Sequence, residues 1–388
     1  MEQRPLEGIV VAEFGNTIAG PFTARILGDL GAEVFKFEPV NGGDPVRQWS
    51  PPHVGGLPST FQALNRGKRS IAVDLRRLED RDVLFRFMTE KADVVVQNTR
   101  PGAMDKLGLG ATALCAAAPR LVYCNISGFG RSGPLKDLAG YDPLMQAFSG
   151  IVSVTGEADR PPSRVGVSIV DIATATWATI GIQAALLRRA NTGRGGVVDA
   201  SLFESALNMM IMPVVQMLAG GAAPGRSGLR GPLVAPNNAY PASDGLLMIT
   251  TATDGQFVKL CGLLGHPELA QDPRYRTVSD RMANEASLSA VIQAAVSRRP
   301  RAEWAALLDA AGIPNAPVQD LAEVMRHAQT LATGMLQSSP DADFRLLGLP
   351  VSIDGERPGF GRPAPQLGAD NQMLFDFAGE GMEAGGSV

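Results

Sequence analysis

Short apolar runs alternate with amphipathic stretches along the first 200 residues of the chain. Runs rich in β-branched and other apolar residues lie at 9–14, 33–37, 70–75, 93–97, 121–126 and 197–200. Helical patterns lie between or after these runs, at 21–30, 77–91, 171–190 and 202–218. Short strands that alternate with helices predict an α/β fold, a Rossmann-like parallel sheet with helices on both faces.

The pattern changes after residue 218. Residues 219–228 are mostly Gly, Ala and Ser, which is typical of a linker. A strand is expected at 246–250, followed by mostly helical text to about residue 335, and the chain from Phe344 onward is rich in Pro and Gly with little periodicity. We therefore expect a large domain over 1–222, a smaller α+β domain over 223–335 and a separate C-terminal segment, 336–388.

Composition narrows the function classes. The formal net charge of −4 argues against a protein that binds nucleic acid through an overall basic field. Three cysteines and three histidines are scattered without metal-ligand or disulfide spacing, so we expect neither kind of site, and a reducing cytoplasm suits the cysteines. The first residues lack a signal-peptide pattern, and no apolar run reaches about 18 residues, so we expect no membrane partner.

Basic residues cluster around the 70–75 run. Asn65–Ser70 contains three positive charges, Arg76 and Arg77 follow the run, and Arg100 and Lys106 lie in a later loop. These loops could form one rim of the sheet that binds a phosphorylated ligand, because Arg and Lys make charge-assisted bonds to phosphate. They could equally be solvated surface charges.

Glycines at positions 128, 130 and 133 match a dinucleotide-binding fingerprint after a predicted strand. Pro134 and a Gly- and Asp-rich stretch follow, however, in place of a clear helix. The first strand, where that fingerprint belongs, is followed by a stretch that does not match it. We therefore favour a glycine-shaped loop over a nicotinamide site.

Asp171 stands at the start of the 171–190 helical pattern, among small residues. An aspartate there is commonly an N-cap, whose carboxylate accepts backbone N–H bonds. The same position also suits an accessible nucleophile, with N–H groups nearby to stabilise an oxyanion. Spacing alone does not choose between these two interpretations.

Several motifs occur in order from about residue 5 to about 370. They are the stretches at 5–14, 19–22, 27–38, 65–75, 93–104, 128–134, 139–142 and 192–195. As a set, they resemble the class III CoA-transferase family, which also contains α-methylacyl-CoA racemases. The family's catalytic aspartate falls on Asp171.

The resemblance implies transfer of coenzyme A from an acyl-CoA donor to a carboxylic acid, through an aspartyl anhydride and an aspartyl-CoA thioester. Coenzyme A would be a substrate, with no metal and no permanently bound cofactor. The resemblance also implies an interlocked, ring-like homodimer in which the C-terminal segment returns to the large domain. Family positions that contact coenzyme A fall on Asn16, Thr17, Ile18, Ala19, Val73, Arg76, Asn98, Thr99, Lys106 and Leu107. Tyr141 matches a position that lines the thioester region, and Asp142 matches an acidic neighbour.

The chain departs from the family pattern at some positions. Pro39 stands where some relatives have Arg, and Gly225–Gly231 is the nearest match to a glycine-rich loop that shields the intermediate. The general pattern looks closer to members that use dicarboxylates such as succinate than to oxalate or carnitine enzymes. Arg47, Arg164 and Arg230 could each meet a distal carboxylate or have a structural role.

Two rival functions remain. A racemase needs a base and an acid on opposite faces of the substrate. Racemases of the family have His and Glu where this chain has Tyr141 and Pro241, so transfer is favoured. A CoA- or nucleotide-binding module without chemistry would leave the order of the motifs unexplained.

Overall fold

The computed structural model describes residues 4–340 and 343–384. The chain folds into two compact units. The second unit consists of Val152–Arg164 and Ala222–His327, and the first unit contains the rest of the described chain.

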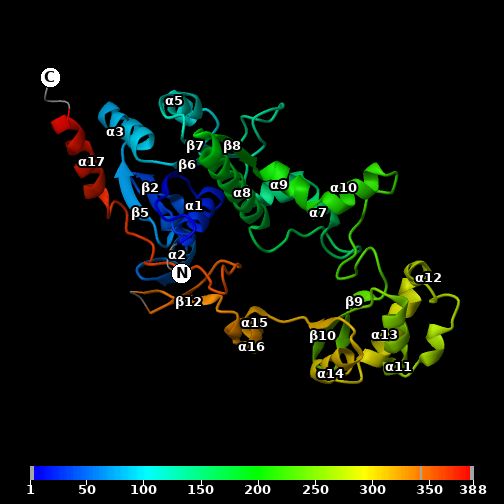
Figure 1. Cartoon of the computed structure of the whole chain (residues 1–388). Helices are drawn as coiled ribbons and strands as arrows, with labels where there is room; N and C mark the ends of the chain where they lie inside the picture. Colours follow the sequence, from blue (N-terminus) through cyan, green and yellow to red (C-terminus); the bar gives the residue numbers. More distant parts are fainter. Residues whose placement is uncertain (1–3, 341–342, 385–388) are drawn as a thin grey trace. The chain divides into compact units, whose positions relative to one another are not determined.

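A six-stranded parallel sheet forms the centre of the first unit, which confirms the predicted α/β fold (Figure 1). Its strands are β1 (Val10–Phe14), β2 (Glu33–Pro39), β5 (Arg69–Val73), β6 (Val94–Gln97), β7 (Val122–Ser127) and β8 (Gly196–Ser201). They lie in the order β5-β2-β1-β6-β7-β8, and every neighbouring pair is parallel. The strand order therefore reverses between β1 and β6, the point at which doubly wound sheets bind ligands.

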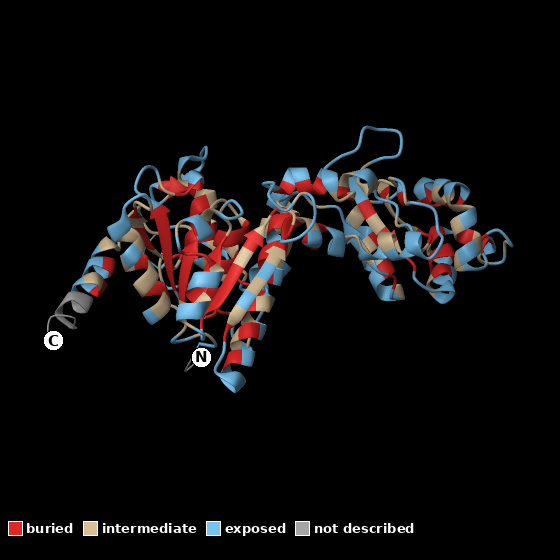
Figure 2. Cartoon of the chain, turned by 90° about the horizontal axis from the view of Figure 1, so that it is seen from above, coloured by how far each residue is buried: buried red, intermediate tan, exposed pale blue. Residues whose placement is uncertain are grey.

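Alternate side chains of each strand enter two separate cores. Val11 and Val94 pack with α1 (Ala19–Asp29) and α8 (Ile169–Thr192) on one face. Ala12 and Val95 pack on the other face with residues of α3 (Leu78–Glu90), α5 (Ala111–Ala117) and α17 (Asn371–Ala384). Figure 2 shows the strands buried between helices whose outer faces are exposed.

Helix α8 is 24 residues long, and its length and hydropathy would suffice to cross a membrane. The sequence has no uninterrupted apolar run of this length, because the helix interleaves larger apolar residues with Thr, Ala and Gly. About 44% of its most apolar window is buried inside the protein, and its buried residues belong to the core beside α1. The core helix of a soluble protein passes the same test, so the finding is weak evidence for a membrane span.

The C-terminal segment covers the exposed edge of the sheet at β5. The backbone N–H groups of Ser70 and Ala72 donate to the side chains of Asp370 and Asn371, at 2.9 and 2.7 Å. An edge strand with satisfied N–H groups is protected from pairing with another chain. Helix α17 then packs Phe377 edge-on against Phe87 of α3. The expectation of little periodicity after Phe344 is wrong for this helix, and Gly385–Val388 lie outside the described residues.

Shorter elements complete the first unit. They are η1 (Pro45–Gln48), β3 (His53–Val54), β4 (Leu57–Pro58), α2 (Ser59–Asn65), α4 (Ala103–Lys106), α6 (Asp142–Phe148), α9 (Leu202–Met209), α10 (Ile211–Leu218), α16 (Ala328–Ala332), β12 (Leu336–Ser338) and β13 (Arg345–Leu347). The helix expected over 202–218 is broken at Met210, between α9 and α10. Helix α7 (Ile151–Val154) runs from the first unit into the second.

The second unit has an α+β architecture, as expected for the smaller domain. Its antiparallel sheet has the order β11 (Asn315–Pro317), β10 (Gly245–Thr250), β9 (Asn237–Ala242). Its helices are α11 (Asp254–Leu264), η2 (Pro267–Ala270), α12 (Val278–Ala283), α13 (Glu285–Val296), α14 (Arg301–Ala311) and α15 (Leu321–Arg326). A separate hydrophobic core, which includes Tyr240, Phe257 and Trp304, holds this unit together.

Candidate active site

A cavity of about 450 Å³ opens at the carboxyl ends of β1, β6 and β7, where the strand order reverses. Many of the predicted site residues line it, namely Asn16, Thr17, Ile18, Ala19, Asn98, Thr99, Tyr141 and Asp171. All of them belong to the first unit. The parallel sheet brings them together because the segments that follow neighbouring strands emerge at the same edge.

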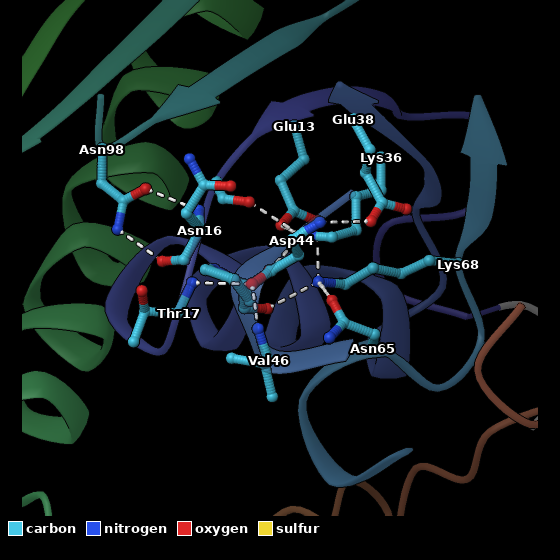
Figure 3. Close-up of polar contacts among 12 residues, drawn as sticks. Glu13, Asn16, Thr17, Lys36, Glu38, Asp44, Val46, Asn65, Lys68 and Asn98 are labelled. Atoms are coloured by element: carbon cyan, nitrogen blue, oxygen red, sulfur yellow. Dashed lines mark hydrogen bonds and ion pairs between the residues drawn. The ribbon is translucent and has the colours of Figure 1, made fainter. Parts of the chain in front are cut away.

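Asn16 and Asn98 join the loops that follow β1 and β6. The N–H of Asn16 donates to Oδ1 of Asn98 at 2.8 Å, and Nδ2 of Asn98 donates to the carbonyl oxygen of Asn16 at 2.8 Å (Figure 3). The pair joins the two loops at the point where the strand order reverses, and both residues line the cavity. Helix α1 begins next to it, at Ala19, and the side chain of the preceding Ile18 provides no cap.

Asp171 lies in the first turn of α8, and only 9% of its surface is exposed. In the part of the chain that the structure describes, no hydrogen bond reaches its carboxylate. Burial, and to a lesser extent the charge of Asp142, raise the pKa of Asp171 to about 7. An unbonded carboxylate that faces a cavity is available to react, so the N-cap interpretation of Asp171 is wrong.

Asp142 provides the cap that Asp171 does not. Its Oδ2 accepts the N–H of Val170 at 2.7 Å and that of Asp171 at 3.4 Å. Gln146, one turn later in α6, donates to Oδ1 of Asp142 at 2.6 Å and accepts the N–H of Val165 at 2.8 Å. Asp142 is therefore a buried support beneath the start of α8, and it does not line the cavity.

Four predicted contact residues lie outside the cavity. Val73 ends β5 and its side chain packs in the core, and Arg76 is exposed and pairs with Asp74 at 2.7 Å. Lys106 ends α4, and Leu107 follows it. The structure does not bring these four side chains to the cavity that contains Asp171.

The basic cluster before β5 is mostly internal, which neither interpretation of the sequence anticipated. Arg66 and Lys68 are almost fully buried. Arg66 pairs with Asp29 at 2.7 Å, and Lys68 pairs with Glu13 at 2.7 Å. These charges neutralise buried carboxylates, so they form neither a ligand-binding rim nor a solvated patch.

Sequence reasoning missed several cavity residues, among them Ser127, Gly128, Leu138, Gly140 and Leu202. Gly128 and Gly140 touch backbone to backbone, since a Cβ on Gly128 would lie 2.6 Å from the nitrogen of Gly140. The glycine at 128 in the sequence pattern therefore indicates a close approach of its backbone to that of Gly140. After these glycines no helix begins before Asp142, in agreement with a loop.

A second cavity, of about 240 Å³, adjoins the first and shares Thr99 and Ser127 with it. Its lining includes the basic residues Arg131 and Lys136. A chain of hydrogen bonds crosses its floor from Gln97 to Asn125 and from Asn125 to Asp199, at 2.7 and 2.9 Å. This cavity extends the polar surface at the same edge of the sheet.

The arginines considered for a distal carboxylate lie elsewhere. Arg47 is partly buried and makes two bonds of 2.7 Å to Glu38. Arg164 and Arg230 belong to the second unit, as does the Gly225–Gly231 stretch. Arg100 is the cationic side chain that lines the first cavity. Among the residues that the structure describes, no group of three His, Cys, Asp or Glu side chains could hold a metal ion.

The chain is similar to several known proteins. A family model described as CoA-transferase family III matches residues 6–371. The chain is 40% identical to acetyl-CoA:oxalate CoA-transferase of Acetobacter aceti, over 95% of both chains. It is 34% identical to succinyl-CoA:glutarate CoA-transferase of Mus musculus, over 96% of this chain and 86% of the relative. The crystal structure of a CaiB/BaiF family protein from Brucella suis is 38% identical, has a TM-score of 0.86, and aligns over 96% of this chain and 99% of that one.

Proposed function

This chain belongs to CoA-transferase family III, and we propose that it transfers coenzyme A between carboxylic acids by way of a covalent intermediate on Asp171. One observation carries the proposal: the carboxylate of Asp171 is mostly buried, has no hydrogen bond among the described residues, and lines the cavity at the switch point of the sheet. A carboxylate with little solvation is a stronger nucleophile than one in water.

The proposed reaction exchanges one carboxylate for another in four steps. An oxygen of Asp171 attacks the donor thioester carbonyl and expels the coenzyme A thiolate. This step forms a mixed anhydride between Asp171 and the donor acyl group. The thiolate attacks the aspartyl carbonyl, which releases the donor acid and forms an aspartyl-CoA thioester. The acceptor carboxylate attacks that thioester and displaces the thiolate, and the thiolate then takes the acceptor acyl group and frees Asp171. Each step makes one bond to carbon and breaks another. The overall reaction exchanges one thioester and free carboxylate for another such pair, so the net free-energy change is small.

Positively charged groups in and beside the cavity suit the anionic substrates of this reaction. The uncapped N-terminus of α1 and the side chain of Arg100 favour a negatively charged ligand, and Arg131 and Lys136 in the adjoining cavity add positive charge. The relatives' names include oxalate and glutarate as acids, which supports a small dicarboxylate as the acceptor for this chain.

We also propose that the enzyme is a homodimer. None of the residues of α10 is buried, and Ile211, Met212, Val215 and Leu218 are each more than half exposed. Helix α8 exposes further apolar side chains, including Trp177 and Leu187. Such apolar surface is costly in water and is typical of a surface that another subunit covers. A second copy of this chain is the partner that the family resemblance implies.

Incubation with a donor acyl-CoA, followed by a hydroxylamine trap and peptide mass mapping, tests the covalent step. The wild-type enzyme should form a hydroxamate on Asp171, and Asp171→Ala should abolish transfer and labelling while it retains affinity for coenzyme A. Asp159→Asn, an exposed aspartate of the second unit, serves as the matched control and should transfer normally. Labelling of Asp142, or turnover by Asp171→Ala, would contradict the assignment, and deuterium uptake at the α-carbon without an adduct would indicate racemisation.

A further inference from the structure

Four buried charged residues form a cluster directly beneath the turn between β1 and α1. Glu13 of β1, Lys36 of β2, Asp44 of the loop after β2 and Lys68 before β5 are each at most 1% exposed. Nζ of Lys36 lies 2.9 Å from Glu13 and 3.0 Å from Asp44. Nζ of Lys68 lies 2.7 Å from the other oxygen of Glu13 (Figure 3).

A buried ionic cluster of this kind is in general weak evidence for a contribution to fold stability. The desolvation of buried ions commonly offsets their attraction, and well-packed apolar residues of similar volume would serve as well. Burial lowers the pKa of Lys68 to about 8 despite the nearby Glu13, whereas at Lys36 the attraction of Glu13 and Asp44 outweighs burial and raises the pKa. The charged side chains of the cluster also make hydrogen bonds to backbone groups. Apolar residues of the same volume could not make these bonds, so they would not fix the backbone in the same position.

The cluster holds the turn that carries Thr17. Oδ1 of Asp44 accepts the N–H of Thr17 at 3.2 Å and that of Val46 at 3.0 Å. Nζ of Lys36 also donates to the carbonyl oxygen of Gly15 at 2.7 Å. Thr17 has a φ of +66°, a left-handed conformation that is unfavourable for a β-branched residue. The bonds to the carbonyl of Gly15 and to the N–H of Thr17 hold the backbone on the N-terminal side of this residue.

Asp44 is itself held from behind. Its N–H donates to Oε2 of Glu38 at 3.0 Å, and Glu38 makes two bonds to the guanidinium of Arg47. The strong bonds of Arg47 keep the pKa of Glu38 at about 2 although burial acts in the opposite direction. The backbone of Asp44 is therefore held by Glu38, and its carboxylate is held by the counter-ion Lys36. These contacts orient the carboxylate toward the N–H of Thr17.

We propose that Asp44 is a positioning residue for acyl-CoA: fixed by Lys36 and Glu38, it locks Thr17 in the left-handed conformation and so preorganises the turn at residues 15–18 for the coenzyme. The inference rests on the proposed function, because it assumes that acyl-CoA binds in the cavity that this turn lines. Preorganisation of this kind raises affinity by removing the cost of ordering the turn when the ligand arrives.

Substitution of Asp44 in three backgrounds tests the proposal. Asp44→Ala should raise the KM for acyl-CoA by about tenfold in the wild type, because a left-handed threonine without its anchor returns to an extended conformation. In a Thr17→Gly background the same substitution should raise KM by only about twofold, since glycine adopts positive φ freely. In a Thr17→Ala background, which retains the Cβ, the increase should again be about tenfold. The rate of Asp171 acylation at saturation should change little in each pair.

An equal increase in KM in all three backgrounds would overturn the proposal, since a merely structural role for Asp44 does not depend on the conformation of residue 17. If Asp44→Ala does not fold, crystal structures of the wild type with and without coenzyme A provide a second test. Thr17 should have positive φ and its bond to Asp44 in both, and a turn that forms only with the ligand would contradict preorganisation. A wild-type enzyme with no calorimetric affinity for acyl-CoA would refute the proposed function itself, whatever the conformation of Thr17.

Discussion

The carboxylate of Asp142 lies against the backbone N–H of Asp171, with its Oδ2 3.4 Å from that nitrogen. One side chain thus caps the helix that carries Asp171 and also places a negative charge close to the Asp171 carboxylate. Burial is the larger cause of the raised pKa of Asp171, and the charge of Asp142 adds to it. An ionised Asp171 nucleophile, as proposed above, would therefore require proton loss near neutral pH.

The pH dependence of acylation should follow this ionisation. With a pKa of about 7, Asp171 is a carboxylate nucleophile only above that pH, so kcat/KM for the donor should rise about tenfold per unit below pH 7 and level off above it. Asp142→Asn should move the rise to lower pH, because it removes the neighbouring charge but leaves an oxygen that can cap α8. A rate that is constant from pH 5.5 to 8.5, or a profile that does not move in Asp142→Asn, would contradict this account.

The same raised pKa predicts a stability cost at high pH. Below the unfolded-state pKa of 3.8, Asp171 is neutral whether the chain is folded or not. Above about pH 7 the folded state contains a buried charge. The free energy of unfolding therefore falls as the pH rises between these two values. Asp171→Asn should therefore be more stable than the wild type at pH 8, by up to about 4 kcal/mol, and equally stable near pH 4. Urea unfolding at both pH values measures the difference, and an equal difference at both would rule out ionisation as its cause.

Periodicity was sufficient to predict the sheet and its flanking helices, because strands buried on both faces, such as β1 and β6, are mostly apolar runs. It did not predict α17, in which Leu374 and Phe377 are buried whereas Phe375 is exposed. The assignment of Asp171 as the nucleophile comes from the resemblance and stays a prediction, whereas strand order explains why the turn at Asn16 meets the loop at Asn98.

Other parts of the site depend on contacts that only the folded chain reveals. The sequence gives no indication that Arg66 and Lys68 face inward, since the partners of these side chains, Asp29 and Glu13, are 37 and 55 positions away. Charged residues near a strand end are usually solvated, so the ordinary expectation was the wrong one here. The close approach of Gly128 to Gly140 likewise brings together two loops that a linear pattern treats as separate.

That glycine contact should be intolerant of any side chain. In Gly128→Ala the new Cβ would lie 2.6 Å from the nitrogen of Gly140, and in Gly140→Ala it would lie 2.7 Å from the Cα of Gly128. Either substitution must push apart two loops of the cavity, so each should lower the free energy of unfolding by about 1–3 kcal/mol and lower kcat/KM at least tenfold. Gly361→Ala, where no atom lies within 4 Å of the added Cβ, is the control and should change neither quantity. Normal kinetics in both cavity variants would show that the loops move apart freely.

The exposed apolar face of α10 predicts the behaviour of the proposed homodimer. Val215 and Leu218 are 56% and 76% exposed in the single chain, and burial of two such side chains would stabilise a dimer by about 3 kcal/mol. Val215→Asp combined with Leu218→Asp should therefore weaken dimerisation by at least about a hundredfold, since it removes this gain and buries two charges instead. Sedimentation velocity over a range of concentrations measures the change. Leu78→Asp, which replaces an apolar residue that is 64% exposed at the start of α3, is the matched control and should dimerise as the wild type does. A wild type that remains monomeric at micromolar concentration, or a double variant that dimerises normally, would mean that this face is not the subunit interface.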